Sequence, residues 1–205
     1  MKRKRLTQEF FNRPTLAVAE ALLGKFLIRK WRGRDISLMI TEVEAYDGFK
    51  DRASHASRGK TLRNTPMFGQ PGHWYVYFTY GMHWMMNIVT KEAGYPAAVL
   101  IRGGLATGKD DETVLVIGPA RLTKFLKIDG KLTGLPASTK TGLWFEDRGV
   151  KKRGNWIYPP SYKTSEDDFS HKAKIKIRRG PRVGIDSAGK YWASKPWRLR
   201  LETTY

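Results

Sequence analysis

The sequence predicts an α+β fold: a single mixed domain with a curved antiparallel sheet, flanking helices and a protruding β-hairpin. Strand-like segments outnumber helix-like ones along the chain. Two of the strands are separated only by a short turn at Tyr80 and Gly81, which requires them to be antiparallel neighbours. No repeat, low-complexity tract or linker divides the 205 residues, so one domain is expected over 1–205.

Two helices are expected, each with a proline in its first turn. RPTLAVAEALLG has Pro14 near its start and Gly24 at its end, and GPARLTKFLKI begins with Pro119 in a similar place. Proline suits the first turn because its missing N–H has no partner there, and glycine adopts the left-handed conformation that ends many helices.

Strands are expected from about Lys25 and within DISLMITEVEAY, YPAAVLIRG and PWRLRLET. The basic, glycine-containing stretches DRGVKKRG and KIKIRRGPRVG are expected to be surface loops between short strands. Side chains alternate between the two faces of a strand. Along MITEVEAY this alternation places on one face Ile40, Glu42, Glu44 and Tyr46, and on the other Met39, Thr41, Val43 and Ala45.

The charge balance favours a polyanionic partner. The chain has 38 Lys plus Arg against 19 Asp plus Glu, a formal net charge of +19. Nucleic acid is the expected partner, and an anionic membrane surface is the competing one. No apolar run is long enough for a membrane span and the N-terminal segment lacks the apolar core of a signal peptide, so a cytoplasmic location is expected.

No metal or cofactor is expected. Cysteine is absent, which excludes disulfides, zinc thiolates and a cysteine nucleophile and fits a reducing compartment. The spacings typical of metal-binding histidines are missing among His55, His73, His83 and His171. The glycine-rich phosphate motifs and the serine-hydrolase elbow are missing as well.

Glu42 and Glu44 are the candidate acid–base pair. On a strand they lie roughly 6.5 Å apart, so one could act as a base while the other forms an ion pair. A solvated strand face, with both carboxylates bound to basic side chains, is the commoner explanation of such a pattern, so the pattern alone does not identify a catalyst. Asn87 and Arg102 interrupt apolar strands and need polar partners, which leaves structural and functional hydrogen bonds both open.

WYVYFTYGMHWMMNIV, residues 74–89, is the predicted hairpin. Its large apolar residues Trp74, Phe78 and Trp84 are expected in the core. Gly81 is expected at the second central position of a type II turn, which would hold Tyr80 out toward solvent. An exposed aromatic on a basic protein could wedge into a stack of bases.

Three further aromatic rings could then bind an extruded base. Enzymes that act on a base within a duplex must take it out of the stack, and flat side chains provide surfaces on which it can lie. The candidates for these surfaces are Tyr46, His55 and Tyr77.

Six segments resemble one known family. TEVEAYDG, SHASRG, LRNTPMFGQPGHWYVYFTYGMHWMMNI, AAVLIRG, IGPARL and PRVGI occur in the order found in the alkyladenine (3-methyladenine) DNA glycosylase family, and the chain is similar to a bacterial-type member. The resemblance covers most of the chain, is most specific from Glu42 to Asn87 and is weakest between Lys131 and Asp168. It implies a mixed α/β domain whose hairpin enters the minor groove of DNA.

The resemblance implies a DNA repair glycosylase that flips damaged purines, of the 3-methyladenine, hypoxanthine and ethenoadenine type, out of double-stranded DNA. A Glu-activated water would hydrolyse the N-glycosidic bond and leave an abasic site. No amine nucleophile occurs at a matching position, so a monofunctional enzyme is expected, acting as a monomer in the bacterial cytosol without a cofactor.

The family's roles map onto nine positions. Glu44 resembles the general base, and Arg102 and the main-chain carbonyl of Val183 resemble the groups that hold its water. The resemblance assigns the walls of the base pocket to Tyr46, His55 and Tyr77, with Tyr46 and Tyr77 on opposite faces of the base.

The remaining roles concern guanine exclusion and the wedge. Asn87 resembles the residue that crowds the 2-amino group of guanine. Tyr80 resembles the residue inserted where the base had been, with Met82 beside it. His83 departs from the pattern, which has a larger aromatic or apolar residue there.

Two other classes of protein fit the same residues. A glycoside hydrolase acting on an anionic polysaccharide would use Glu42 and Glu44 as its pair. A non-catalytic nucleic-acid binder would use the charge and the aromatic rings but tolerate the loss of both carboxylates.

Overall fold

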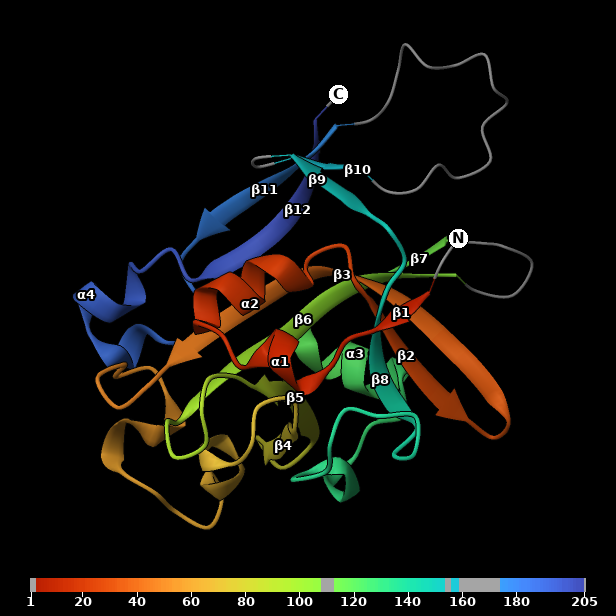
Figure 1. Ribbon diagram of the computed structural model, residues 1–205. Coiled ribbons are helices and arrows are strands. Elements are labelled where there is room, and N and C mark those ends of the chain that lie inside the picture. Colours follow the sequence, from red (N-terminus) through yellow and green to blue (C-terminus); the bar gives the residue numbers. More distant parts are fainter. Residues whose placement is uncertain (1–2, 108–112, 154–155, 159–173, 205) are drawn as a thin grey trace, which may run out of the picture.

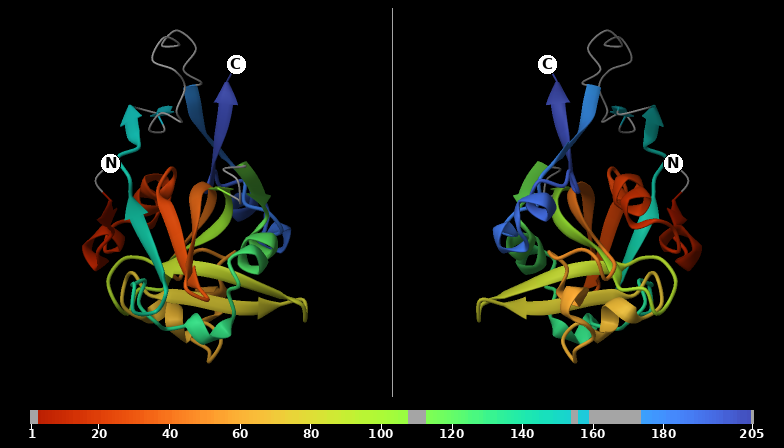
Figure 2. Two further views of the ribbon diagram at one scale, coloured as in Figure 1. Left: turned by 90° about the vertical axis from the view of Figure 1, so that its right-hand side faces the viewer. Right: turned by 90° about the vertical axis from the view of Figure 1, so that its left-hand side faces the viewer.

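The computed structural model describes residues 3–107, 113–153, 156–158 and 174–204 (Figure 1). Within them, one sheet of 12 strands forms the body of the domain, and its pairings are antiparallel. The sheet is strongly curved, since the β4–β5 hairpin runs across the direction of β11 and β12 (Figure 2). The predicted α+β class, with a curved antiparallel sheet and flanking helices, is confirmed.

The strands lie in the order β1-β8-β2-β3-β12-β11-β10-β9, with a branch from β3 through β6 to β5 and β4 and to the edge strand β7. Their bounds are β1 Lys4–Arg5, β2 Phe26–Trp31, β3 Arg34–Asp47, β4 Trp74–Thr79, β5 His83–Val89, β6 Ala97–Thr107, β7 Thr113–Ile117, β8 Leu143–Asp147, β9 Lys151–Arg153, β10 Trp156–Tyr158, β11 Lys174–Gly180 and β12 Arg198–Thr204. The helices are α1 Gln8–Phe11, α2 Thr15–Leu22, α3 Pro119–Phe125 and α4 Lys190–Ala193. None of these helices is long and apolar enough to cross a membrane.

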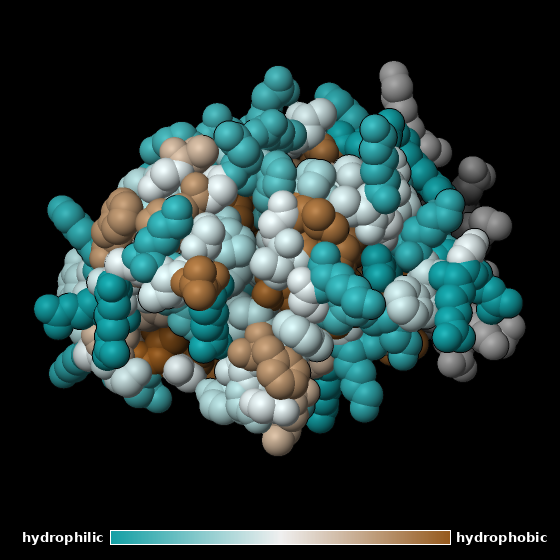
Figure 3. All heavy atoms as spheres, turned by 90° about the horizontal axis from the view of Figure 1, so that it is seen from below, coloured by the Kyte–Doolittle hydropathy of each residue, from teal (hydrophilic) through white to brown (hydrophobic). Residues whose placement is uncertain are grey.

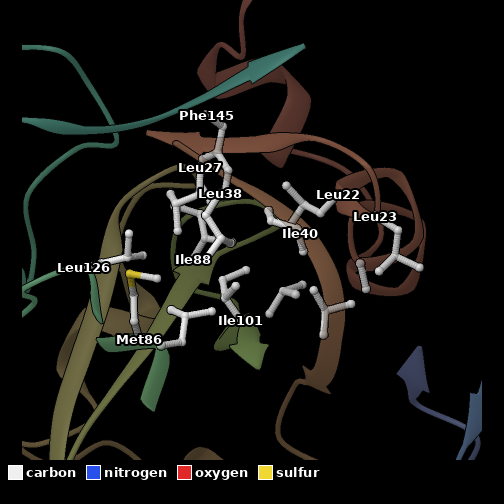
Figure 4. Close-up of a cluster of buried hydrophobic side chains, with 14 of the residues drawn as sticks. Leu22, Leu23, Leu27, Leu38, Ile40, Met86, Ile88, Ile101, Leu126 and Phe145 are labelled. Carbon is white, nitrogen blue, oxygen red and sulfur yellow. The ribbon is translucent and has the colours of Figure 1, made fainter. Parts of the chain in front are cut away.

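Both predicted helices form, and a proline precedes the first residue of α2 and is the first residue of α3. Pro14 is the N-cap of α2, and Gly24 follows that helix with a φ of 79°. The buried side of α2 packs into the core beside β3, where Leu22 lies close to Ile40 (Figure 4). The end of α3 closes the opposite side of the same core through Leu126.

A bulge in β3 changes which side chains share a face. The pairing with β6 shifts on both sides of Glu42, so that Thr41 on β3 and Arg102 on β6 are extra residues in the ladder. An extra residue resets the alternation of side chains. Ile40 therefore packs in the core with Val43 and Ala45, and the prediction that it shares a face with the two glutamates is wrong.

The turn of the hairpin is of type I′, and the predicted type II is wrong. Tyr80 has a φ of 52° and Gly81 a φ of 65°, and the Met82 N–H donates to the Thr79 carbonyl over 3.2 Å. Type I′ turns match the twist of the flanking strands, whereas type II turns splay them. Tyr80 is 81% exposed, as predicted.

Two further predictions are corrected. Phe78 was expected in the core but is 44% exposed, because it lies near the tip of the hairpin, whereas Trp74 at the other end of β4 is buried. The Phe78 ring packs against the Trp84 ring, with the two ring centres 4.7 Å apart. KIKIRRG forms β11, since its Lys–Ile alternation turns the isoleucines toward the core. β9 likewise lies within DRGVKKRG, whose last residue is outside the described ranges.

Gly104→Ala is expected to destabilise the fold by about 1–3 kcal/mol or more, because overpacking a filled core forces backbone shifts. A Cβ at this position would lie 2.0 Å from Leu38 Cδ2 and 2.7 Å from the Met39 carbonyl oxygen. Gly180→Ala is the matched control, since a Cβ there meets no atom within 4 Å. Urea unfolding measures both variants, and equal stabilities would contradict the packing described for β3 and β6.

Candidate active site

A cavity of about 340 Å³ opens between the β4–β5 hairpin, β6, the end of β3 and the loop before α4. Its volume lies within the range of small-molecule sites. Seven of the nine predicted site residues line it, namely Tyr46, His55, Tyr77, Tyr80, Asn87, Arg102 and Val183. Glu44 lies behind the wall, and Met82 is 67% exposed at the hairpin tip.

The Glu44 carboxylate is completely buried and hydrogen-bonded at both oxygens. Oε1 accepts the Val183 N–H at 2.8 Å, and Oε2 accepts the Tyr46 hydroxyl at 2.9 Å. Arg102 Nη1 lies 3.4 Å from Oε2. The three partners of the carboxylate, Tyr46, Arg102 and Val183, all line the cavity. Glu44 therefore lies directly behind the cavity wall and contacts the residues that form it.

Burial raises the pKa of Glu44 above its ordinary value. The charge of Arg102, the Val183 amide and the Tyr46 hydroxyl each lower that pKa, but they do not outweigh the desolvation. Burial and the neighbouring carboxylate also raise the pKa of Tyr46 well above its ordinary value, which keeps its hydroxyl protonated and donating. Glu44 is thus a stronger proton acceptor than an exposed glutamate.

Glu42 is held in two ion pairs. Its Oε1 accepts Arg102 Nε at 3.0 Å and Arg198 Nε at 2.7 Å. Arg102 therefore bridges the two glutamates. It is the extra residue on β6 at the bulge, and its side chain points toward both carboxylates. The two carboxylates do share one side of the sheet, but their surroundings are different.

A buried ion pair fixes the loop that carries Val183, and the sequence did not point to it. Arg182 bonds Asp51 through Nη1 at 2.6 Å and Nη2 at 2.8 Å, and Nη1 also donates to the Ala45 carbonyl at 2.9 Å. The guanidinium lies 4.7 Å from the Tyr46 ring centre. This pair ties the 181–185 loop to the segment after β3, so the Val183 amide is held against Glu44.

The aromatic wall contains one residue more than predicted. The Tyr75 hydroxyl lies 2.9 Å from His55 Nδ1, and the His55 ring meets the Tyr77 ring edge-on at 4.6 Å. Burial and the nearby Arg63 lower the pKa of His55, so its imidazole is neutral at neutral pH. Burial raises the pKa of Tyr77 to about 12, which keeps its hydroxyl protonated.

Asn87 lies at the cavity wall and is almost fully buried. Its Nδ2 donates to the Tyr75 carbonyl at 3.0 Å across the hairpin. The amide thus makes the structural hydrogen bond that a buried polar group needs and lines the cavity as well.

Metal ligands do not converge in the part of the chain that the structure describes: no group of three His, Asp or Glu side chains is close enough to hold an ion. His171 lies outside these ranges. The expected lack of a metal and a cofactor stays a prediction.

Comparison with known proteins identifies the class. A model of the family described as methylpurine-DNA glycosylase matches residues 9–204. A protein of Methanocella arvoryzae named "Putative 3-methyladenine DNA glycosylase" is 39% identical over 95% of this chain and 90% of its own length. A protein of Streptomyces avermitilis with the same name is 40% identical over 96% of this chain and 87% of its own length.

The chain therefore belongs to the methylpurine-DNA glycosylase family. It is a DNA glycosylase of base-excision repair, a hydrolase that acts on N-glycosyl bonds in alkylation-damaged DNA.

Proposed function

We propose that the enzyme flips a damaged purine out of the duplex into the 340 Å³ cavity and hydrolyses its N-glycosidic bond with a water activated by Glu44. The observation that carries the proposal is the fully buried Glu44 carboxylate, which lies behind an aromatic cavity and has a raised pKa. A buried carboxylate beside a cavity, with a pKa raised by desolvation, is a candidate catalytic base.

In the proposed step, the water oxygen bonds to C1′ of the sugar as the bond from C1′ to the purine nitrogen breaks. The purine leaves with the bonding electrons, and Glu44 takes a proton from the water. The ionised carboxylate also stabilises the positive charge that develops on the sugar. The product is an abasic site in an uncut strand.

The contacts of Glu44 suggest where the water would bind. Oε2 accepts the Tyr46 hydroxyl and is ion-paired with Arg102, whereas among the described contacts Oε1 accepts only the Val183 amide. A carboxylate oxygen has two lone pairs. We propose that the water uses the second lone pair of Oε1 and is also held by Arg102 and the Val183 carbonyl.

The aromatic walls fit an uncharged or alkylated purine. We propose that the base stacks between Tyr46 and Tyr77, with His55 at its edge. The raised pKa of each tyrosine keeps the walls uncharged. Damaged purines of the 3-methyladenine, hypoxanthine and ethenoadenine type pair poorly or leave readily, so flipping or releasing them costs less than for normal bases.

Backbone strain supports the proposed wedge at Tyr80. A non-glycine residue with a left-handed conformation costs about 1–2 kcal/mol, and such strain is concentrated at functional sites. Tyr80 has this conformation and exposes 81% of its surface. We propose that it fills the gap left by the flipped nucleotide, with Met82 beside it in the minor groove.

We propose a monofunctional enzyme that acts as a monomer, and the cavity lining supports the first of these two points. No lysine is among the described residues that line it, so a Schiff base with the sugar has no candidate amine there. The glycoside hydrolase alternative is disfavoured because two arginines hold the Glu42 carboxylate. A non-catalytic binder would not need the buried Glu44, whose burial is costly.

Glu44→Gln is expected to lower base release by roughly 100- to 10,000-fold, the usual contribution of a general base. The amide keeps the shape of the side chain but cannot accept the proton. Glu42→Gln is the matched control and is expected to lose much less. Single-turnover release from duplex oligonucleotides carrying hypoxanthine, followed as abasic sites, measures both.

Equal losses in the two variants would support a two-carboxylate glycosidase mechanism. Full activity in Glu44→Gln would remove the proposed base. Binding of the damaged duplex should stay close to the parental value in both variants, which separates loss of chemistry from loss of binding.

Asn87→Ser is expected to raise the release of guanine relative to hypoxanthine. If Asn87 meets carbon 2 of the purine, it crowds the amino group that guanine carries there, and hypoxanthine has only hydrogen at that position. Single-turnover rates for both bases, each opposite cytosine, give the ratio, and hypoxanthine release is the internal control. An unchanged ratio would show that Asn87 has only its structural bond to Tyr75.

A further inference from the structure

The side of the sheet that carries the two glutamates continues along β12 as a basic surface. Arg198 donates to Glu42, so its side chain lies on the same side as the active site. Side chains two residues apart on a strand share a face. Arg200 and Glu202 therefore extend that face outward, while Leu199 between the arginines is buried in the core.

β11 adds a second arginine directly opposite the first. Arg178 pairs with Arg200 in the antiparallel register, and β11 and β12 run side by side away from β3 (Figure 1). Both side chains are half exposed, at 53% for Arg178 and 50% for Arg200. Their Nε atoms bond the two oxygens of one carboxylate, Glu202, each at 2.8 Å.

These residues line a hollow of about 590 Å³, separate from the cavity. Two like charges directly opposite each other on neighbouring strands are unfavourable, and the single charge of Glu202 balances only one of them. Each guanidinium has five N–H donors, so Glu202 leaves donors of Arg178 and Arg200 for another anion. Guanidinium groups bind phosphate oxygens in a bidentate manner.

We propose that Arg178 and Arg200, the arginine pair of β11 and β12, bind backbone phosphates of the duplex beside the flipped nucleotide. This inference rests on the proposed function. Arg200 lies two residues beyond Arg198, roughly 6.6 Å along the strand. One DNA strand advances about 3.4 Å per nucleotide, so this step along β12 spans about two nucleotides of a strand.

The location favours DNA over a free anion. The pair is continuous with Arg198, Glu42 and Arg102, which lead directly to the cavity. Strongly hydrophilic side chains also surround the face that Figure 3 shows from below. A duplex that delivers a base to the cavity would therefore meet the arginine pair on the side of the sheet that carries Arg198 and Glu42.

The test is the salt dependence of binding to an undamaged duplex. Each phosphate contact contributes about 0.9 to the slope of log K against log [salt]. Arg178→Gln/Arg200→Gln is expected to lower that slope by about 1–2. Arg32→Gln/Arg34→Gln makes the same change in charge at the exposed β2–β3 turn and is expected to leave the slope unchanged.

A second variant is expected to change the affinity for the duplex in the opposite direction. Glu202→Gln removes the carboxylate that competes with phosphate, so duplex binding should become tighter. Glu9→Gln on α1 is its control, with the same change in charge at another exposed glutamate. Weaker or unchanged binding in Glu202→Gln would contradict the proposal even where the double arginine variant folds poorly.

The remaining outcomes separate the two levels of the proposal. A parental protein with neither base release nor salt-dependent binding would overturn the proposed function itself. A parental protein with both, and a slope equal in the parental and Arg178→Gln/Arg200→Gln proteins, would overturn the phosphate contact alone. If the slope fell equally in the Arg32→Gln/Arg34→Gln control, the change would be an effect of net charge, and the proposed phosphate contact would also be overturned.

Discussion

The site depends on one constraint, the complete burial of the Glu44 carboxylate. A buried charge is unfavourable unless polar partners compensate for the lost water, and the two hydrogen-bond donors and one ion-pair partner of Glu44 come from different parts of the chain. Tyr46 follows on the same strand, Arg102 occupies the bulge in β6, and the Val183 amide lies in a distant loop. The Arg182–Asp51 ion pair holds that loop in place, so the pKa of Glu44 depends on residues that do not themselves line the cavity.

The sheet also places two carboxylates with different surroundings two residues apart on β3. The bulge keeps the apolar side chains of β3 in the core on both sides of Thr41 while Glu42 and Glu44 lie on the opposite side. Arg102 then contacts both carboxylates, whereas among the described residues Arg198 pairs with Glu42 and not with Glu44. The same ladder that forms the core thereby separates an ion-paired glutamate from the proposed base.

Much of this was predictable from local patterns, and the failures have physical causes. Alternation and turn chemistry predicted the hairpin and the exposure of Tyr80, but not the type I′ turn, because a tyrosine is seldom found at positive φ. The bulge at Thr41 was missed because strict alternation was assumed along the strand, although Thr41 and Glu42 are two polar residues in succession between Ile40 and Val43. The cavity residues were predicted through family resemblance, whereas Arg182 could not be singled out among 38 basic residues, since its role depends on meeting Asp51 in the folded chain.

The most direct test of the account is the pH dependence of single-turnover release in the parental enzyme and in Tyr46→Phe, with an alkylated purine whose fixed positive charge removes any need to protonate the leaving base. Phenylalanine keeps the stacking ring but removes the hydrogen bond that lowers the pKa of Glu44. Because the base must be ionised, a higher pKa moves the acid limb of the profile to higher pH. The account predicts that shift, with similar rates on the high-pH plateau, and identical acid limbs in the two proteins would contradict Glu44 as the base.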